Sequence, residues 1–249
     1  MTSLTIDIGN TQIKYDFWDG NEFLKRLTNP NFEEVINLVK NDKVRGIIIS
    51  SVSRDPRQMA EKFRENLPEV TTVIFDNKEI ERYGELIKYK GKVGADRIAA
   101  YLGAKVFLSA GEGALIVDMG TAMTLDIADK NGCYCGGNIS AGFKTRLKSL
   151  AGATAFLPEV ENIHKYISFG HDTVSSLQSG AVNGVMGEII FAQERAKKEF
   201  DIRNTLITGG DSEWFAKLLG KERDCRWDPY LVGRGLNSHL HQFYFPLQR

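Results

Sequence analysis

Two stretches of the chain share one order of apolar and polar positions. Residues 4–20, LTIDIGNTQIKYDFWDG, and residues 115–132, LIVDMGTAMTLDIADKNG, both begin with an apolar run that ends in Asp-x-Gly. Small hydroxyl or amide residues follow in each, and then a second run that is typical of a strand. This repeat predicts that two halves of the chain have the same structure.

The first half of the pattern predicts three strands followed by alternating helices and strands. Residues 3–9, 12–18 and 21–28 have the apolar or alternating character of strands, and an Asp-Gly turn precedes the third, which indicates an antiparallel meander. Apolar positions then recur at helical or strand spacing. The elements expected there are helices at 31–42, 55–67 and 94–108 and strands at 44–52 and 70–76.

The second half of the chain repeats this order of elements. Strand patterns at 114–120, 123–129 and 133–139 are followed by two helical patterns, by a strand, glycine turn and helix at 204–220, and by a closing helix at 228–243. The fold class expected is therefore α/β, with a duplicated domain. We expect an N-terminal domain of residues 1–110 and a C-terminal domain of residues 111–249.

Composition and charge exclude several classes of protein. The chain has 249 residues, of which 42% are hydrophobic and 26% charged, so a packed core is expected. Lysine plus arginine equals aspartate plus glutamate at 32 each, so the basic footprint of a nucleic-acid-binding protein is missing. The N-terminus has neither the cationic nor the apolar region of a signal peptide, and no apolar stretch is long enough to span a bilayer. We expect a cytoplasmic protein without a nucleic-acid or membrane partner.

The cysteines and histidines give no clear metal site. An odd number of cysteines, three, fits a reducing compartment better than a disulfide framework. Cys133 and Cys135 could share one strand face, but a second pair of ligands is missing, which favours small buried thiols. None of the four histidines has a trusted ligand spacing, and the two near the C-terminus, His239 and His241, are expected to be solvated.

The repeated Asp-x-Gly turn has the chemistry of a phosphate-binding loop. A strand that ends in Asp7 places a carboxylate at the edge of a sheet, and Gly9 lets backbone amides approach a ligand. Asn10, Thr11 and Lys14 then supply neutral donors and one cation, which suit the charged oxygens of a nucleotide. The carboxylate can hold a divalent ion, or its bound water, beside the phosphates.

A single turn of this kind would be weak evidence, because Asp-x-Gly is common in ordinary hairpins. Here the turn at Asp118 repeats the turn at Asp7, and Gly209 and Gly210 form a third turn between a strand and a helix. The combination resembles the superfamily of sugar kinases, heat-shock chaperones and actin, in which paired loops clasp phosphates and a late Gly-Gly turn lies against the adenosine.

Four linked motifs resemble those of a narrower family, the type III pantothenate kinases. They are DIGNTQIK, VGADRIAA, VDMGTAMTLD and GGNISAGF, in the family's order over nearly the whole chain. The resemblance implies two tandem ribonuclease-H-like (actin-like ATPase) domains with the active site in the cleft between them. It also implies transfer of phosphate from ATP to the primary hydroxyl of pantothenate, which gives 4'-phosphopantothenate in the first step of coenzyme A biosynthesis.

The resemblance makes Asp96 the expected catalytic residue. A carboxylate there would orient the pantothenate hydroxyl and accept its proton. The alternative is that Asp96 only caps the helix predicted from residue 94. Gly94, Ala95 and Arg97 are expected to line the pantothenate site, with Arg97 facing the pantothenate carboxylate as a planar donor. An exposed helix arginine is the alternative for Arg97.

Two further residues are assigned to pantothenate by the resemblance. Tyr89 matches a tyrosine that the family usually continues with Asn-Pro, whereas this chain has the shorter segment YKGKVG before Asp96. Thr173 matches a threonine that contacts the substrate in the family. Without the resemblance, Thr173 would be interpreted as a helix cap.

ATP with Mg²⁺ and a monovalent cation, K⁺ or NH₄⁺, are the cofactors that the resemblance implies. Asp118 is expected to hold the monovalent cation, and Asp7 to lie near Mg²⁺ through water. Asp126 could support Mg²⁺ or could be an outward-facing strand carboxylate. The residues expected to bind ATP are Asp7, Gly9, Asn10, Thr11, Lys14, Thr121, Gly209 and Gly210.

The resemblance also implies a homodimer, for which the long helix from residue 172 is a candidate interface. Three other functions remain open from the sequence. The chain could be a nucleotide-binding accessory regulator of transcription with little turnover, an ATPase of the actin or chaperone type, or a kinase for another hydroxylated small molecule. The presence of Asp96, Arg97, Asp7 and Asp118 argues against the regulator. The chain is too short for the large insertions of the ATPases, which argues against that class.

Overall fold

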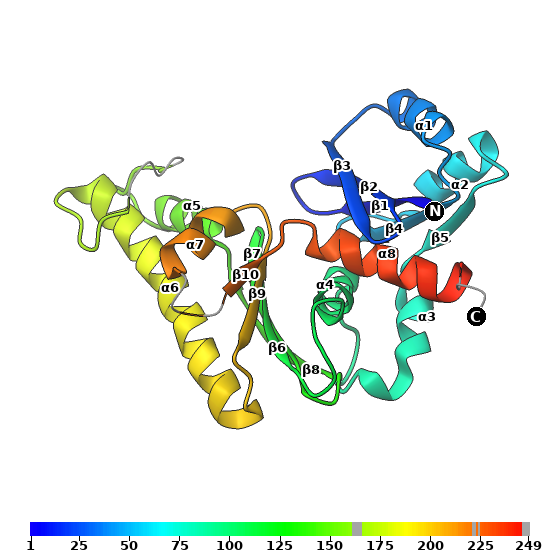
Figure 1. Cartoon of the computed structure of the whole chain (residues 1–249). Helices are drawn as coiled ribbons and strands as arrows, with labels where there is room; N and C mark the ends of the chain where they lie inside the picture. Colours follow the sequence, from blue (N-terminus) through cyan, green and yellow to red (C-terminus); the bar gives the residue numbers. More distant parts are fainter. Residues whose placement is uncertain (161–165, 221–222, 224, 246–249) are drawn as a thin grey trace. The chain divides into compact units, whose positions relative to one another are not determined.

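The structure of the protein is a computed structural model that describes residues 1–160, 166–220, 223 and 225–245. The chain forms two compact units (Figure 1). Unit 1 contains Met1–Ser109 together with the C-terminal segment from Tyr230, and unit 2 contains Ala110–Pro229. Each unit is built on one five-stranded sheet.

The sheet of unit 1 consists of β1 (Thr2–Ile8), β2 (Ile13–Asp19), β3 (Glu22–Thr28), β4 (Gly46–Ser51) and β5 (Thr71–Ile74). The order is β3-β2-β1-β4-β5. The first three strands form the predicted antiparallel meander, and β4 and β5 run parallel to β1. Parallel pairing requires crossover connections, which explains why helices separate the later strands.

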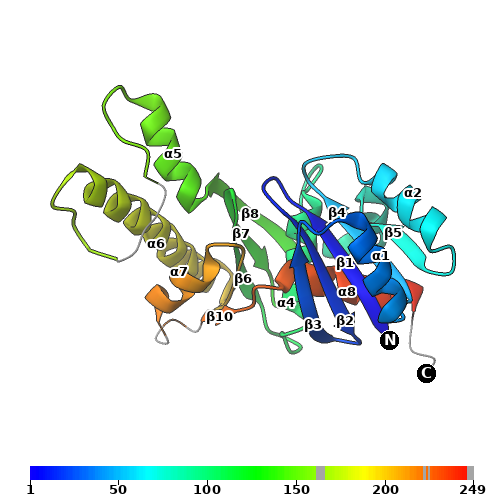
Figure 2. The ribbon, with the colours of Figure 1, turned by 90° about the horizontal axis from the view of Figure 1, so that it is seen from above.

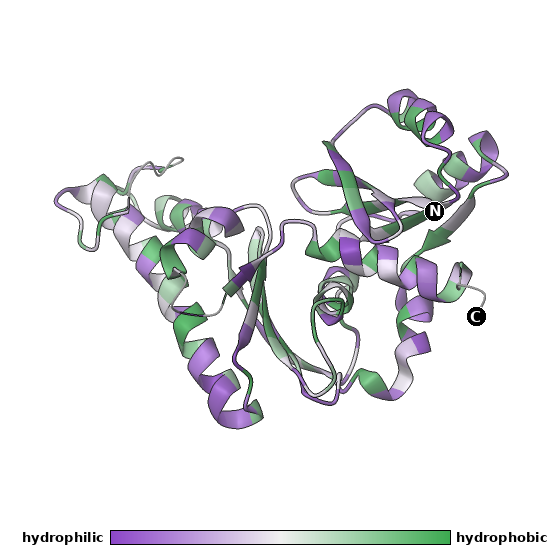
Figure 3. Cartoon of the chain, viewed as in Figure 1, coloured by the Kyte–Doolittle hydropathy of each residue, from purple (hydrophilic) through white to green (hydrophobic). Residues whose placement is uncertain are grey.

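Helices α1 (Phe32–Asn41) and α2 (Arg57–Asn66) cover one face of this sheet. Their apolar residues pack on the inward positions of β1, β2 and β4 in one core cluster, and Asn31 caps α1 by accepting from the backbone of Glu34. Both helices alternate between hydrophilic and hydrophobic stretches along the ribbon (Figure 3), as expected for helices with one buried stripe.

Helices α4 (Ala95–Lys105) and α8 (Leu231–Tyr244) lie on the other face of the same sheet. They pack with almost no space between their backbones. A Cβ atom added to Gly103 would lie 2.0 Å from the carbonyl oxygen of Leu231, and one added to Gly235 would lie 1.8 Å from that of Ala99. Any side chain at either glycine would push the two helices apart.

The position of α8 differs from the expected division of the chain. The expected boundary at residue 110 matches the end of the first segment of unit 1, but the closing helix lies in unit 1 and not with residues 111–229. The glycine contact with α4 explains this difference, because it matches α8 to a helix of unit 1. The expectation for His239 was wrong, since this residue of α8 is completely buried.

The sheet of unit 2 repeats that of unit 1. It consists of β6 (Ala114–Met119), β7 (Ala122–Ala128), β8 (Tyr134–Ala141), β9 (Asn204–Thr208) and β10 (Cys225–Trp227), in the order β10-β9-β6-β7-β8. The strands β6, β7 and β8 are antiparallel, and β9 and β10 run parallel to β6. The same five-strand topology therefore occurs twice, which confirms the predicted duplicated α/β fold.

One face of the second sheet is covered by α5 (Phe143–Ala153), α6 (Thr173–Phe200) and α7 (Ser212–Leu219), as Figures 1 and 2 show. Alternate residues of β6 and β7 join these helices in one core cluster. Among the described residues, no helix combines the length and apolar character needed to cross a membrane.

Candidate functional site

Asp7 lies near the end of β1, on the face of the sheet that α8 covers. The alternation of β1 places Leu4, Ile6 and Ile8 in the core against α1 and α2, so Asp7 points to the opposite side. There Lys14 of β2 stands directly opposite Asp7 in the antiparallel register.

Burial dominates the electrostatics of Asp7. Loss of water around the carboxylate, opposed by the positive charge of Lys14, raises its pKa from 3.8 to about 6. The charges of Asp96 and Asp16 raise it further, and the charge of Arg26 lowers it. Asp96 therefore lies near enough to Asp7 to affect its ionisation, although 89 positions separate the two residues in the chain (96 − 7).

The loop after β1 is a tight turn. The backbone N–H of Gly9 donates to the carbonyl oxygen of Gln12 at 3.1 Å, and the carbonyl oxygen of Gly9 accepts from the hydroxyl of Ser53 at 3.0 Å. Asn10 and Thr11 are exposed at the tip of this loop. The turn therefore presents the two side chains at the end of the strand that carries Asp7.

Asp96 lies in the first turn of α4, two residues after the N-cap Gly94. Its Oδ1 accepts from the backbone N–H of Arg97 at 2.8 Å. A Cβ atom at Gly94 would lie only 2.5 Å from the same oxygen. Asp96 is therefore not the N-cap residue, and its carboxylate is folded over a glycine that leaves room for it.

Arg97 and Tyr89 come together beside this helix start. The guanidinium carbon of Arg97 lies 5.6 Å from the centre of the Tyr89 ring, within the range of a cation–π contact. Arg97 is only 6% exposed, so the alternative of an exposed helix arginine is wrong. The structure thus brings Tyr89, Gly94, Ala95, Asp96 and Arg97 into one short region of unit 1.

Ser50 is a polar residue beside Asp7 that the sequence analysis missed. It is the parallel partner of Asp7 on β4 and is fully buried. Its hydroxyl makes no hydrogen bond with another described residue. The only signal in the sequence is the pair of serines, Ser50 and Ser51, that ends the apolar strand Gly46–Ser51.

In unit 2, Asp118 occupies the position that Asp7 has in unit 1. It is the second-last residue of β6, with Thr124 of β7 and Thr208 of β9 as its register partners. Gly209 lies against it with φ +98°, and a Cβ atom there would lie 2.6 Å from Oδ1 of Asp118 and 2.5 Å from the nitrogen of Met119. Only a residue without a side chain fits at position 209, so the glycine turn can lie directly against Asp118.

The loop that carries Thr121 is held from β8 and α5. The backbone N–H of Gly142 donates to the carbonyl oxygen of Thr121 at 3.0 Å, and the hydroxyl of Thr145 donates to the same oxygen at 2.6 Å. Gly142 must be small, because a Cβ atom there would lie 2.0 Å from the carbonyl oxygen of Gly120. Thr121 and, after β9, Gly210 are exposed.

Asp126 is not an outward-facing carboxylate. It is 1% exposed and accepts from the hydroxyl of Tyr134 at 2.8 Å. It pairs with Ile116 rather than with the end of β6, so it lies two register positions before Asp118. Its expected role toward Mg²⁺ stays a prediction.

Thr173 is the first residue of α6 and is exposed. The helix is capped by Asp172, whose carboxylate accepts from the backbone of Ser175, so the alternative that Thr173 is the cap is wrong. Thr173 lines a hollow of about 450 Å³ together with residues of α6 and apolar residues such as Leu150. Its contact with a substrate stays a prediction. The expected placement of the active site between the two domains also stays a prediction.

The donor groups of the site fit a metal that arrives with phosphates. Within the described ranges, no three His, Cys, Asp or Glu side chains form a group able to hold a metal ion. Magnesium in kinase sites usually keeps several waters and binds through one or two carboxylates plus substrate phosphates. The half-buried carboxylate of Asp7 suits that arrangement. Cys133 is buried as expected, and Cys135 and Cys225 are partly exposed.

Comparisons with known proteins show the family of this chain. The family described as type III pantothenate kinase matches residues 3–193. A type III pantothenate kinase of Flavobacterium psychrophilum is 31% identical over 222 residues, which cover 87% of this chain and 90% of the relative. One of Azobacteroides pseudotrichonymphae is 30% identical over 242 residues, 95% of each chain.

Solved structures show the same fold. A Campylobacter jejuni protein described as a candidate Baf family transcriptional activator has a TM-score of 0.63 at 22% identity, covering 96% of this chain and 98% of its own. A candidate N-acetylmannosamine kinase of Listeria monocytogenes has a TM-score of 0.55 at 15% identity, covering 97% and 99%. The two-domain fold of sugar kinases is thereby confirmed. With the family match over residues 3–193, these findings show that the chain belongs to the type III pantothenate kinase family.

Proposed function

We propose that this protein transfers the γ-phosphoryl group of ATP to the primary hydroxyl of pantothenate, which gives 4'-phosphopantothenate and ADP in the first step of coenzyme A biosynthesis. The observation that carries the proposal is the arrangement at the start of α4. There Asp96, folded over Gly94 and followed by the buried Arg97, lies within electrostatic reach of Asp7. Family membership gives the substrates.

Asp96 orients the pantothenate hydroxyl and takes its proton. The hydroxyl oxygen attacks the γ-phosphorus, the bond from that phosphorus to the β,γ-bridging oxygen breaks, and the proton moves to the Asp96 carboxylate. Because such transfers pass through a loose transition state, positioning of the nucleophile supplies much of the rate. The hydrogen bond from the Arg97 backbone and the space at Gly94 support this role, since both fix the carboxylate.

Pantothenate is bound by the region around Arg97. The planar guanidinium suits the pantothenate carboxylate, and its contact with Tyr89 limits its orientations. Gly94 and Ala95 line the same helix start. Thr173, which lines the hollow in unit 2, contributes a further hydroxyl to substrate binding.

ATP is held by the loops that follow the two equivalent strands. Gly9, Asn10 and Thr11 in the first loop and Thr121 in the second supply backbone and hydroxyl donors, and Lys14 supplies positive charge. Gly209 and Gly210 form the turn for the nucleoside. Asp7 holds Mg²⁺ through water, and the metal supplies positive charge to the phosphates when bound.

Asp118 holds a monovalent cation, K⁺ or NH₄⁺, near the phosphates. Its carboxylate and the hydroxyls of its register partners Thr124 and Thr208 are oxygen donors of the kind that hard cations prefer.

We also propose a cytoplasmic homodimer in which α6 contributes to the interface. The exposed apolar side chains Val174 and Phe191 on α6 support this, and light scattering would test it.

A coupled ADP-release assay tests the function. The purified protein is given ATP, Mg²⁺ and K⁺ with pantothenate, with a panel of sugars, or without an acceptor. We expect ADP release only with pantothenate. Release without any acceptor would indicate an ATPase, release with a sugar would indicate another kinase, and no release with any acceptor would favour a regulator that only binds nucleotide.

A further inference from the structure

The segment Ile87–Val93 joins the last turn of η1 (Glu81–Leu86) to the N-cap of α4. It contains Tyr89 and lies immediately before Gly94 and Asp96. Most of its residues are exposed, and it has no helix or long strand of its own. The way in which its two ends are held therefore contributes to its conformation.

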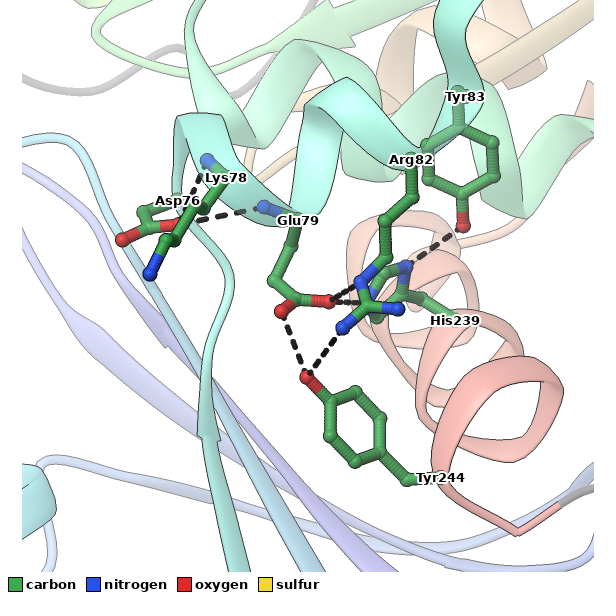
Figure 4. A network of polar contacts seen from close by, with 7 residues as sticks. All are labelled: Asp76, Lys78, Glu79, Arg82, Tyr83, His239 and Tyr244. Carbon is green, nitrogen blue, oxygen red and sulfur yellow. Dashed lines mark hydrogen bonds and ion pairs between the residues drawn. The ribbon is translucent and has the colours of Figure 1, made fainter.

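The N-terminal end of this segment is held through a buried histidine of α8 (Figure 4). His239 is 0% exposed, and its Nδ1 lies 2.8 Å from the hydroxyl of Tyr83 in η1. Its Nε2 lies 2.8 Å from Oε2 of Glu79, in α3 (Asn77–Ile80). Burial lowers the pKa of His239, so the ring is neutral at pH 7. Since the carboxylate can only accept, Nε2–H donates to Glu79 and Nδ1 accepts from Tyr83.

Glu79 joins further groups to the same point. Its carboxylate accepts from the hydroxyl of Tyr244 at 2.7 Å and pairs with Nε of Arg82 at 2.7 Å. Burial opposes its ionisation, but the hydrogen bonds from Tyr244, His239 and Arg82 lower its pKa overall. The carboxylate of Glu79 therefore contacts His239 and Tyr244 of α8 and Arg82 of η1. Tyr83 of η1 joins the same network through His239, as Figure 4 shows.

The other end of the segment is held by the same helix. Asp96 lies in the first turn of α4, and α4 is in backbone contact with α8 at Gly103 and Gly235. Both ends of Ile87–Val93 are thus fixed to α8, one by a polar network and the other by a glycine contact. Since the two fixed ends restrict the loop between them, α8 limits where Tyr89 can lie.

We propose that the Glu79–His239–Tyr83 network is a positioning device for pantothenate: it holds η1 on α8 and thereby sets the position of Tyr89 against Arg97. This inference rests on the proposed function for its substrate. The network touches none of the expected reacting atoms, so its residues are positioning residues. It also offers a reason for the departure of this chain from the family's usual Tyr-Asn-Pro, because a segment without that proline needs its position fixed from outside.

A matched pair of variants tests the device. Tyr83→Phe removes the hydroxyl that joins η1 to His239. Ser3→Ala removes another buried hydroxyl partner of the same helix, the donor to Oδ1 of Asn237 at 2.5 Å, but this contact joins α8 to β1. For Tyr83→Phe we expect the KM for pantothenate to rise by about threefold to tenfold, with the KM for ATP and kcat close to those of the parent. For Ser3→Ala we expect both KM values to stay near the parent's.

Limited proteolysis gives a readout that does not depend on activity. Lys88, Lys90 and Lys92 are exposed in the segment, so trypsin cleavage after them reports its mobility. We expect faster cleavage there in Tyr83→Phe than in Ser3→Ala, and faster still in Glu79→Gln, which weakens three contacts at once. A parent without pantothenate turnover would remove the proposed function, but cleavage would still test the device. Equal cleavage rates and equal KM values in Tyr83→Phe and Ser3→Ala would overturn it.

Discussion

The two units have the same strand order, but the residues around the equivalent aspartates differ. In unit 1, Asp7 stands opposite Lys14, and the charges of Asp96, Asp16 and Arg26 also act on it. In unit 2, Asp118 stands between Thr124 and Thr208, with Gly209 against its carboxylate.

On the proposed function, this difference gives each unit a different part of one reaction. Unit 1 combines a carboxylate of raised pKa, a lysine and a second acid at a helix start, which suits the groups that meet the nucleophile and Mg²⁺. Unit 2 provides hydroxyl and carboxylate oxygens beside a glycine turn, which suits a cation and the nucleotide. The shared topology sets the position of the aspartate at the strand end. The side chains around it determine which ligands its carboxylate suits.

The largest expected effect is on kcat, and it distinguishes the role of Asp96 from that of Asp118. Asp96→Asn should lower kcat by about a hundredfold to ten-thousandfold, the usual contribution of a general base, while ATP binding stays near that of the parent. Asp118→Asn should act mainly on the KM for ATP. Steady-state kinetics and ATP titration would measure both. An equal loss of kcat in the two variants would contradict the division between the units.

Gly94 lies against the carboxylate of Asp96, and Gly209 lies against that of Asp118. These two glycines give a second comparison between the units. Gly94→Ala should displace the Asp96 carboxylate and lower kcat by up to about a hundredfold, because small misplacements of catalytic groups have large effects. Gly209→Ala should raise the KM for ATP and destabilise the protein by at least ~1 kcal/mol, because its φ of +98° disfavours a side chain.

Gly152→Ala is the matched control for both glycines. A Cβ atom at this position of α5 meets nothing within 4 Å, and alanine is a better helix former. Its kinetics and its melting temperature should equal or exceed those of the parent. Normal kinetics in Gly94→Ala would show that the space at Gly94 does not serve Asp96.

Replacement of the cation tests unit 2 separately. If K⁺ and NH₄⁺ are both replaced by Na⁺, activity should fall by roughly tenfold to a hundredfold, the size of a strong coupling between two bound ligands. Asp118→Asn should have lost most of this dependence, whereas Asp126→Asn should keep it. If the parent is equally active in Na⁺, Asp118 does not hold a K⁺ or NH₄⁺ ion that the reaction needs.

The smallest expected effect concerns the stability of unit 1. Because the pKa of Asp7 is raised to about 6, the folded state binds its proton more tightly than the unfolded state does. The contribution of Asp7 to the free energy of unfolding therefore falls as the pH rises from about 4 to about 6, and stays low above that. Asp7→Asn should be more stable than the parent at neutral pH by about 1–3 kcal/mol, with the difference shrinking toward pH 4. Urea unfolding across this range measures it, and a difference that is independent of pH would contradict the assignment.

The sequence predicted the elements with strong periodicity and missed those without it. The three strands at the start of each half, the helix after Gly94 and the long helix α6 all occur where the apolar pattern places them. The short α3 and η1 and the three-residue β10 have too few positions to show a period. The pattern also predicted α8 as a helix, but not that its glycines match it to α4.

The residues of the candidate site could be proposed from the sequence where a local motif carries them, but not where they are brought together by residues far apart in the chain. Asp7, Lys14 and Gly9 follow from one motif, and Asp96 followed from the family resemblance. His239 was assigned to solvent because its partner Glu79 lies 160 residues earlier, so no local pattern indicates its burial. Ser50 was missed for a similar reason, since only the parallel pairing of β1 with β4 places it beside Asp7.

Identification of the phosphorylated product tests the central claim most directly. The parent and Asp96→Asn are incubated with ATP, Mg²⁺, K⁺ and pantothenate, and the products are followed by phosphorus NMR. We expect the parent to form a phosphate monoester on the primary hydroxyl of pantothenate together with ADP, and folded, ATP-binding Asp96→Asn to form almost none. A parent that releases ADP without this ester, or an Asp96→Asn variant that forms it at the parent's rate, would contradict the account.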